Sequence, residues 1–200
     1  MLFRSVPALL RNDPAFTRYF AARALATMGR MAMPFYILHE GHNSALSGAT
    51  LGILTFAFTL SGTFSNLFWG PIGDRKGFRV TFLASIAVWV LATLLLMLVV
   101  GNLPVTILVF VGIGAAVQGF QNASQNMTLE FGRRDDLPVR IAIANTTSEM
   151  AGTIGPLLGG VLAALAGYQA VFLASIVFLI LGGVVVAWYV PEPRKHGESL

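Results

Sequence analysis

The stretch Gly70-Pro-Ile-Gly73-Asp74-Arg75-Lys76-Gly77-Phe78-Arg79 is a charged island between two long apolar segments. No Asp, Glu, Lys or Arg occurs from Gly41 to Gly73, and a second apolar run begins at Val80. Each segment is long enough to cross a bilayer, which takes about 20 apolar residues. The glycines permit a sharp turn, and the cations favour the cytoplasmic side of a membrane. We therefore predict a tight cytoplasmic turn between two membrane-spanning helices.

The composition of the chain is that of an integral membrane protein. Of its 200 residues, 56% are hydrophobic and 11% are charged, whereas soluble domains carry about 25% charged residues. The mean hydropathy is +0.74. The net charge of +4 does not predict nucleic-acid binding, because the cations fall at the borders of the apolar segments. The lipid bilayer is the expected partner, and a nucleic acid is not.

Side chains that catalysis and metal binding require are scarce. The sequence contains no Cys, and its three His lie in predicted loops or in the C-terminal tail. Neither a metal cluster nor a Ser–His dyad can be assembled within the membrane from such a set. No phosphate-binding glycine loop is followed by Lys-Ser or Lys-Thr. We expect no metal site, no cofactor and no enzymatic activity.

Apolar segments separated by polar turns predict an all-α bundle of six transmembrane helices within residues 16–190. The loop cations are confined to the N-terminal segment 1–15, to the two charged loops and to the tail 191–200. The positive-inside rule therefore places both termini in the cytoplasm of a protein of the cell membrane. The six spans are expected at approximately 16–38, 47–70, 80–100, 105–129, 141–165 and 170–190.

Two ionisable side chains are predicted inside the membrane. Arg18 and Arg23 mark the expected cytoplasmic end of the first helix, and Arg30 lies about 10 Å deeper. Pro34 removes the backbone hydrogen bond to the Arg30 carbonyl, so we expect a kink there. Glu149 lies about 12 Å inside the fifth helix, at a similar depth. The two either neutralise each other through a direct or water-bridged contact, or Glu149 exchanges protons with solvent.

Four amides share one face of the predicted fourth helix, at Gln118, Gln121, Asn122 and Gln125. A stripe of amides is too costly to face lipid, so it must face the bundle interior or a wet cavity. We predict a cavity wall that contacts solute, with hydrogen-bonded packing between helices as the alternative.

Small residues recur along the predicted fifth helix. Their spacing allows close packing of a neighbouring helix, and the proline allows a local bend. The residues of this helix-packing motif are Gly152, Gly155, Pro156, Gly159 and Gly160.

The order of these features resembles the major facilitator superfamily of secondary transporters over nearly the whole chain. It is most similar to the second, C-terminal six-helix half of a twelve-helix protein. The resemblance rests on the Gly70–Arg79 motif and on Arg18-Tyr-Phe-Ala-Ala-Arg23 before a first helix that ends in Pro34-Phe-Tyr36. It rests also on Arg140-Ile-Ala-Ile-Ala-Asn145-Thr, on Gly155-Pro-x-x-Gly-Gly160, and on Gly167-Tyr168 with Val171-Phe172.

This resemblance implies alternating access, in which two six-helix halves rock around a central site. It implies a cytoplasmic gate in which Asp74 braces the end of the fifth helix, while Arg75 and Arg79 reach acids near the fourth helix, such as Glu130. The glycines Gly70, Gly73 and Gly77 belong to the same motif. Helices one, two, four and five, with Arg30, Asn145 and Glu149, are expected to line the cavity, and helices three and six to face lipid.

The sequence therefore predicts transport of a small solute, with proton coupling as one option, by one half or a fragment of a transporter. The missing half is a second six-helix bundle or another copy of this chain. The alternative is a six-helix membrane protein that packs against a partner without transporting a solute.

Overall fold

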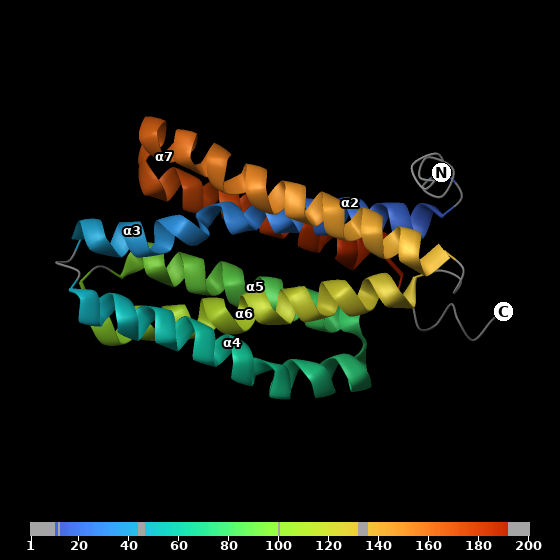
Figure 1. The fold of residues 1–200 in the computed structure, drawn as a ribbon, viewed down its shortest axis with the longest axis horizontal. Helices are drawn as coiled ribbons and strands as arrows, with labels where there is room; N and C mark the ends of the chain where they lie inside the picture. Colours follow the sequence, from blue (N-terminus) through green and yellow to red (C-terminus); the bar gives the residue numbers. More distant parts are fainter. Residues whose placement is uncertain (1–10, 12, 44–46, 100, 132–135, 192–200) are drawn as a thin grey trace.

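The computed structural model describes residues 11, 13–43, 47–99, 101–131 and 136–191, and these contain helices and turns but no strand. The helices are long and mostly antiparallel, and the connections between them are short (Figure 1). They are α2 (Pro14–Met28), η1 (Gly29–Ala32), α3 (Met33–Asn43), α4 (Gly48–Lys76), α5 (Phe78–Leu98), α6 (Leu103–Glu130) and α7 (Leu137–Tyr189).

The first helix is broken by a short 3-10 turn at the predicted position. η1 separates α2 from α3, and the backbone N–H of Met33 donates to the carbonyl oxygen of Arg30. Pro34 cannot supply the usual α-helical donor, so the chain tightens to the i→i+3 pattern. The hydroxyl of Ser175 on α7 donates to the carbonyl oxygen of Gly29 over 2.7 Å. This interruption lies next to Arg30, at the position where the sequence predicts a kink.

The stretch from Gly70 to Arg79 is mostly helical, which corrects the expectation of a ten-residue turn. α4 continues through Pro71 to Lys76, and Arg79 lies in the first turn of α5. Gly77 alone connects the two helices, with a φ of 92° that disfavours any side chain. A Cβ on Gly73 would lie 2.3 Å from the ring of Phe78, so Gly73 lets the two helices meet.

The long helix α7 consists of two helical arms that fold back at Gly167. This residue has φ 80° and ψ 173°, which a helix cannot contain. The bend falls within the turn predicted at residues 166–169. Gly101, in the predicted outer turn between α5 and α6, also has a positive φ, of 73°.

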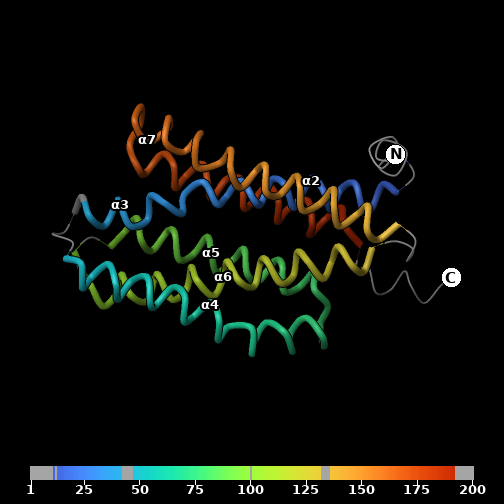
Figure 2. Tube along the Cα trace, in the orientation of Figure 1, coloured from blue at the N-terminus to red at the C-terminus, as the bar shows by residue number. Residues whose placement is uncertain are grey.

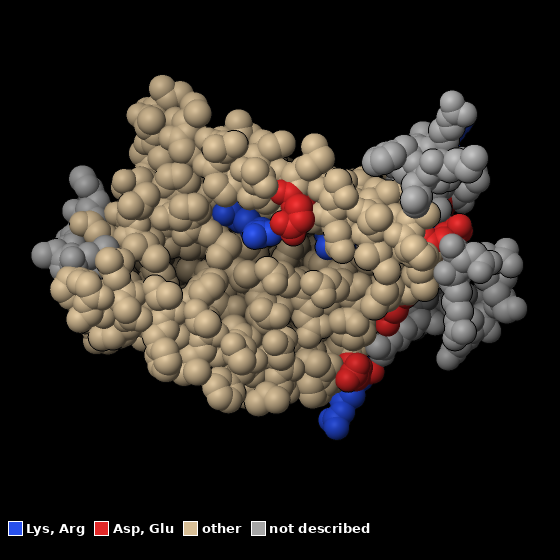
Figure 3. Space-filling model, viewed as in Figure 1, with Lys and Arg blue, Asp and Glu red and all other residues tan. Residues whose placement is uncertain are grey.

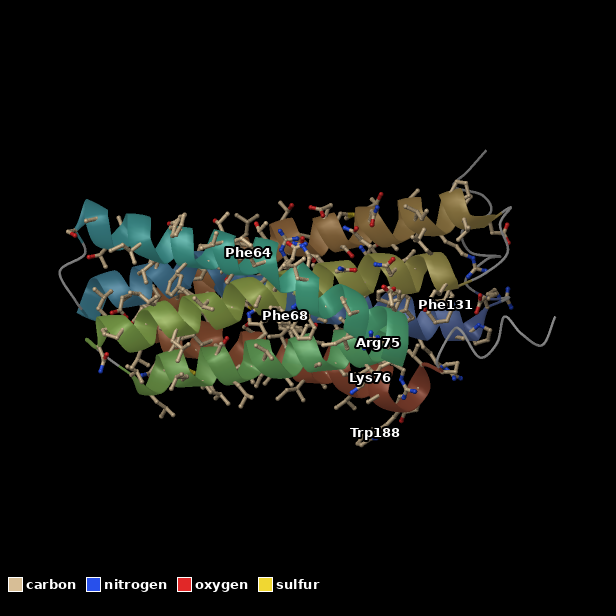
Figure 4. The ribbon with its side chains drawn as sticks, turned by 90° about the horizontal axis from the view of Figure 1, so that it is seen from below. Phe64, Phe68, Arg75, Lys76, Phe131 and Trp188 are labelled. Atoms are coloured by element: carbon tan, nitrogen blue, oxygen red, sulfur yellow. The ribbon has the colours of Figure 1, made fainter. Side chains whose placement is uncertain are left out.

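The helices pack in two groups, one around α7 and the other around α6. α2 and η1 pack on α7, whereas α6 packs on both α4 and α5. The Cα trace shows that α2 begins, α6 ends and α7 begins at one end of the bundle, and the turn from α4 to α5 lies towards this end (Figure 2). Phe131, Arg75, Lys76 and Trp188 all lie in the same half of the bundle (Figure 4). The charged segments of the sequence therefore gather towards one end.

Four of the described helices are long and apolar enough to cross a membrane, namely α4, α5, α6 and α7. α4 is much less covered than the others. Of the residues in its most apolar window, 17% are buried, against 44–50% for the other three helices. Phe64 and Phe68, labelled in Figure 4, are 56% and 69% exposed on this helix.

The core includes an aromatic cluster away from the charged end. The indole N–H of Trp89 donates to the hydroxyl oxygen of Tyr36 over 3.1 Å, and the Tyr36 hydroxyl lies 2.8 Å from that of Thr93. Tyr36 also lies against Phe172, with 5.3 Å between the ring centroids. These contacts join α3, α5 and the second arm of α7.

Candidate functional site

A polar cavity of about 320 Å³ lies midway along the bundle, between α2, η1, α6 and the first arm of α7. Figure 3 shows acidic and basic side chains gathered at the middle of this face of the molecule, where the surface is hollowed. The lining residues are Arg23, Thr27, Arg30, Phe120, Gln121, Ser124, Gln125, Asn145, Ser148 and Glu149.

Arg23 is a residue of the cavity, which corrects its expected place at the cytoplasmic end of the first helix. It is 7% exposed. Its guanidinium donates to the hydroxyl of Thr128 on α6 over 2.9 Å and to the side-chain oxygen of Asn145 on α7 over 3.0 Å. These bonds compensate part of the cost of removing the charge from water. Arg23 thereby joins three helices at the cavity wall.

Arg30 projects from η1 into the same cavity and also lines a second hollow of about 260 Å³. Within the described part of the chain, no acceptor hydrogen-bonds its guanidinium. The group lies against α7, where a Cβ on Gly152 would lie 3.0 Å from its Nη1 atom. Gly152, expected to serve helix packing, makes room for this guanidinium.

Glu149 lines the cavity from α7, as Arg30 does from η1. Their predicted similar depth agrees with this shared location. Among the described residues, however, the ion pair within 4.0 Å that the structure contains is Arg140 with Asp13. Arg30 and Glu149 line one cavity without an ion pair within 4.0 Å between them, so the direct form of the expected pair is not present.

The amide stripe of α6 divides between two surroundings. Gln121 and Gln125 line the cavity, and Gln118 and Gln121 line the second hollow beside Thr59 and Thr63 of α4. Asn122 instead points towards α4. Its amide nitrogen donates to the side-chain oxygen of Asn66 over 3.3 Å, and its own side-chain oxygen accepts from Asn126 over 2.6 Å. Three of the four amides therefore face open space, and Asn122 joins two helices.

The residues of the expected gate lie near the turn from α4 to α5. Gly70, Asp74 and Arg75 belong to the last turns of α4, and both charged side chains are exposed. Arg79 donates to the carbonyl oxygens of Val186, over 3.2 Å, and of Ala187, in the last turn of α7. A guanidinium at that position satisfies carbonyls that a helix end leaves without partners. The sequence did not indicate this partner for Arg79. Glu130 is the last residue of α6.

The small residues of α7 meet the first helix at Gly155 and Gly159 as well as at Gly152. A Cβ on Gly155 would contact Met31, and one on Gly159 would lie 2.9 Å from both the Met31 carbonyl oxygen and the Phe35 ring. Gly160 has no atom within 4 Å of such a Cβ. Pro156 lies within the helix.

A sequence profile described as Major Facilitator Superfamily matches residues 19–200. The chain belongs to the Major Facilitator Superfamily. Membership in this family accounts for the long apolar helices and indicates a membrane protein of the transporter class rather than an enzyme.

Two curated proteins are similar to this Major Facilitator Superfamily chain. Multidrug resistance protein D of Escherichia coli K12 is 27% identical over 185 residues, which are 85% of this chain and 44% of that protein. The bicyclomycin resistance protein homolog of Haemophilus influenzae is 26% identical over 155 residues, or 74% of this chain and 36% of that protein. The chain thus spans less than half the length of these relatives.

Sequence reasoning missed several residues of the cavity in this Major Facilitator Superfamily chain. Arg23 and Thr27 lie seven and three residues before Arg30, which was predicted, and these spacings place all three on one helix face. Ser124 and Ser148 each lie three residues after a predicted residue, Gln121 and Asn145 respectively. A search for polar residues in phase with those already selected would have identified them.

Proposed function

We propose that the chain is one half of a secondary transporter of the cell membrane and that its polar cavity forms part of the chamber for a small organic solute. The observation that carries this proposal is the cavity itself, with two Arg, a Glu and several amides midway along apolar helices. Charged groups at that depth are too costly to leave against hydrocarbon, and they mark solute pathways in membrane proteins. The names of the two relatives support an organic solute.

Six membrane crossings are part of this proposal. α2, η1 and α3 together form the first crossing, α4, α5 and α6 the next three, and the two arms of α7 the last two. The end that holds the α4–α5 turn and the start of α7 faces the cytoplasm in this proposal, because the loop cations gather there. The chain lacks Cys, so single cysteines at Asn102 and Lys76 report orientation cleanly. An impermeant thiol reagent outside the cell reacts at Asn102, and labelling at Lys76 instead contradicts the orientation.

A second six-helix bundle is proposed to cover the cavity. α4 and the first arm of α7 lie on opposite sides of α6 in Figure 1. Both expose large apolar side chains, including Leu67 at 69%, Leu157 at 68% and Val161 at 60%. A partner bundle seated on these two helices would close the cavity towards lipid. The relatives, more than twice as long as their matched segments, contain chain enough for such a bundle.

Solute contact is assigned to Arg30, Gln118, Gln121, Gln125 and Asn145, and proton exchange to Glu149. Glu149 is the carboxylate among the residues that line the cavity. It has no ion-pair partner within 4.0 Å in the described part of the chain, which supports its availability to solvent.

Transport is tested by expressing the full chain with the part of the Escherichia coli relative that lies outside the matched segment. Membrane vesicles with both pieces should accumulate or expel organic solutes, and vesicles with either piece alone should not. Gln121→Leu with Gln125→Leu removes polar groups from the cavity and should abolish the activity. Leu91→Ile, at a 65% exposed position on α5, is the matched control and should retain it. Assembly of the two pieces without any solute flux contradicts the proposal.

A further inference from the structure

We infer that the solute carries an anionic group, of carboxylate or similar chemistry, and that Arg30 binds this group. The inference rests on the proposed function, because it takes the cavity as the solute site. It adds the charge class of the solute, which neither family membership nor the names of the relatives state.

The ionisable groups on the cavity wall carry an excess of positive charge. The lining contains the guanidinium groups of Arg23 and Arg30 and the carboxylate of Glu149. At short range in a medium of low dielectric, two cations repel a cationic solute and attract an anionic one. The wall as a whole therefore selects against a positively charged solute.

The two arginines differ in how their donors are used. Arg23 is committed to the structure through its bonds to Thr128 and Asn145. The donors of Arg30 contact no acceptor in the described part of the chain. A guanidinium presents five N–H groups in a planar fork that matches a carboxylate, so Arg30 is the group suited to bind a solute.

Two buried hydroxyls add donors to the same wall. Ser124 on α6 and Ser148 on α7 are 2% and 6% exposed, and both line the cavity. Their Oγ atoms are buried, and no described protein group hydrogen-bonds them. Buried hydroxyls without a partner are costly, and each could donate to an anionic oxygen after a rotation of its side chain towards the cavity. The donors that face the open space without such a rotation are those of Arg30.

Gly152 holds Arg30 in place for this role. The guanidinium packs against the backbone of α7 because position 152 has no side chain, and an added Cβ would lie 3.0 Å from its Nη1 atom. Gly152 is therefore a positioning residue. Its replacement by Ala should displace the guanidinium and weaken anion binding while leaving neutral compounds unaffected.

The Glu149 carboxylate and an anionic solute are both attracted to the arginines of the cavity. Glu149 lines the same cavity as Arg30 but forms no ion pair within 4.0 Å with it. An anionic solute bound at Arg30 in this cavity is repelled by the Glu149 carboxylate. Glu149→Gln should therefore strengthen anion binding several-fold.

Binding is measured with the full chain assembled with its complementary bundle in lipid nanodiscs. The probes are two sets of compounds that are similar in size and differ in charge. One set is 4-hydroxybenzoate, 4-hydroxybenzamide and 4-hydroxybenzylamine, and the other is gluconate, glucose and glucosamine. The readout is the dissociation constant at fixed ionic strength, from the shift in thermal unfolding with concentration.

In at least one set, the anion should bind more tightly than its neutral and cationic analogues. Arg30→Gln should raise the dissociation constant of the anion by about tenfold to a hundredfold, which is the range for a hydrogen bond to a charged group. Arg30→Lys should raise it less, because lysine keeps the positive charge. The matched control is Arg18→Gln, an exposed arginine outside the cavity lining, which should leave the constants unchanged.

Three other outcomes overturn the inference and are distinguishable. Neutral or cationic compounds that bind at least as tightly as the anions, with binding lost in Gln121→Leu, would keep the cavity as the solute site and refute the charge class. Absence of binding by every compound would refute both the inference and the proposed function. Equal loss of anion binding in Arg30→Gln and Arg18→Gln would also refute the assignment of Arg30.

Discussion

Asp13 and Arg140 form an ion pair with 2.7 Å between carboxylate and guanidinium, across 127 residues of sequence. The pair ties the start of α2 to the start of the first arm of α7. Asp13 also caps α2, since its other carboxylate oxygen accepts from the backbone N–H of Phe16 over 2.9 Å. The guanidinium carbon of Arg140 lies 4.6 Å from the centroid of the Phe16 ring. One carboxylate thus fixes two helix ends at the charged end of the bundle.

Asp13→Asn should lower the free energy of unfolding by about 1–3 kcal/mol, because it removes a charged hydrogen bond to a largely buried arginine. The amide retains capping ability, so the loss reports the ion pair rather than the cap. Thermal unfolding in detergent measures it, and Arg18→Gln is the control at an exposed position. An unchanged unfolding temperature in Asp13→Asn would show that the pair contributes nothing to stability.

Arg30 and Glu149 should be energetically coupled more weakly than Asp13 and Arg140. The latter pair is in direct contact, whereas the former shares a cavity beyond 4.0 Å. Double-mutant cycles on unfolding temperature compare the two pairs in one assay. The cycle for Arg30→Ala and Glu149→Ala should give the smaller interaction energy of the two, because these side chains share a cavity but form no ion pair within 4.0 Å. A coupling as large as that of Asp13 and Arg140 would show that the two side chains close into contact in the membrane.

Gly159→Ala and Gly160→Ala should have opposite effects on stability, although the residues are adjacent. An added Cβ at Gly159 would lie 2.9 Å from the Met31 carbonyl oxygen, and one at Gly160 would meet nothing within 4 Å. We expect Gly159→Ala to cost about 1–3 kcal/mol by overpacking. Gly160→Ala should be neutral or stabilise by up to about 1 kcal/mol, because alanine is the better helix former. Equal effects in thermal unfolding would contradict this packing of α7 on the first helix.

Asp74→Asn should change mainly the transport rate, whereas Arg79→Gln should change mainly the stability of the fold. Arg79 caps the end of α7, so its replacement should lower the unfolding temperature. Asp74 is exposed, and its proposed bracing role acts on the conformational equilibrium of the assembled transporter, by about 1–3 kcal/mol. Asp74→Asn should change the transport rate with little effect on unfolding. Normal transport by Asp74→Asn would exclude the gate role.

The positions of the helices were predictable because apolar length and turn residues report them directly. Gly77, Gly101 and Gly167, the described residues with positive φ, all fall in turns that the sequence predicted. The end of α4 was not predictable in the same way. Hydropathy indicates where the hydrocarbon ends, whereas the helix itself continues from Gly70 to Lys76 into the polar region.

The sequence was sufficient to predict which helices line the cavity, but it identified only some of the residues that line it. Arg30 and Glu149 stood out because charges within apolar runs are rare. Arg23 was assigned to the membrane border, since arginines usually mark it. Its buried position depends on Thr128 and Asn145, which are 105 and 122 residues away in the sequence. Such partners are brought close by tertiary packing. Tertiary packing also decides whether Arg30 and Glu149 form an ion pair, because depth along a helix says nothing about distance across the bundle.

The turn η1 also sets the rotational phase of the first helix. A 3-10 helix advances about 120° per residue and an α-helix about 100°, so the four residues Gly29–Ala32 rotate α3 by about 80° relative to an unbroken α-helix. In this phase the Tyr36 hydroxyl meets Thr93 and the Trp89 indole. Conversion of η1 to α-helix would turn Tyr36 away from α5 and also turn Arg30 relative to α2. The winding of one short turn can therefore exchange the neighbours of half a helix, while it changes the length of that helix by only about 2 Å.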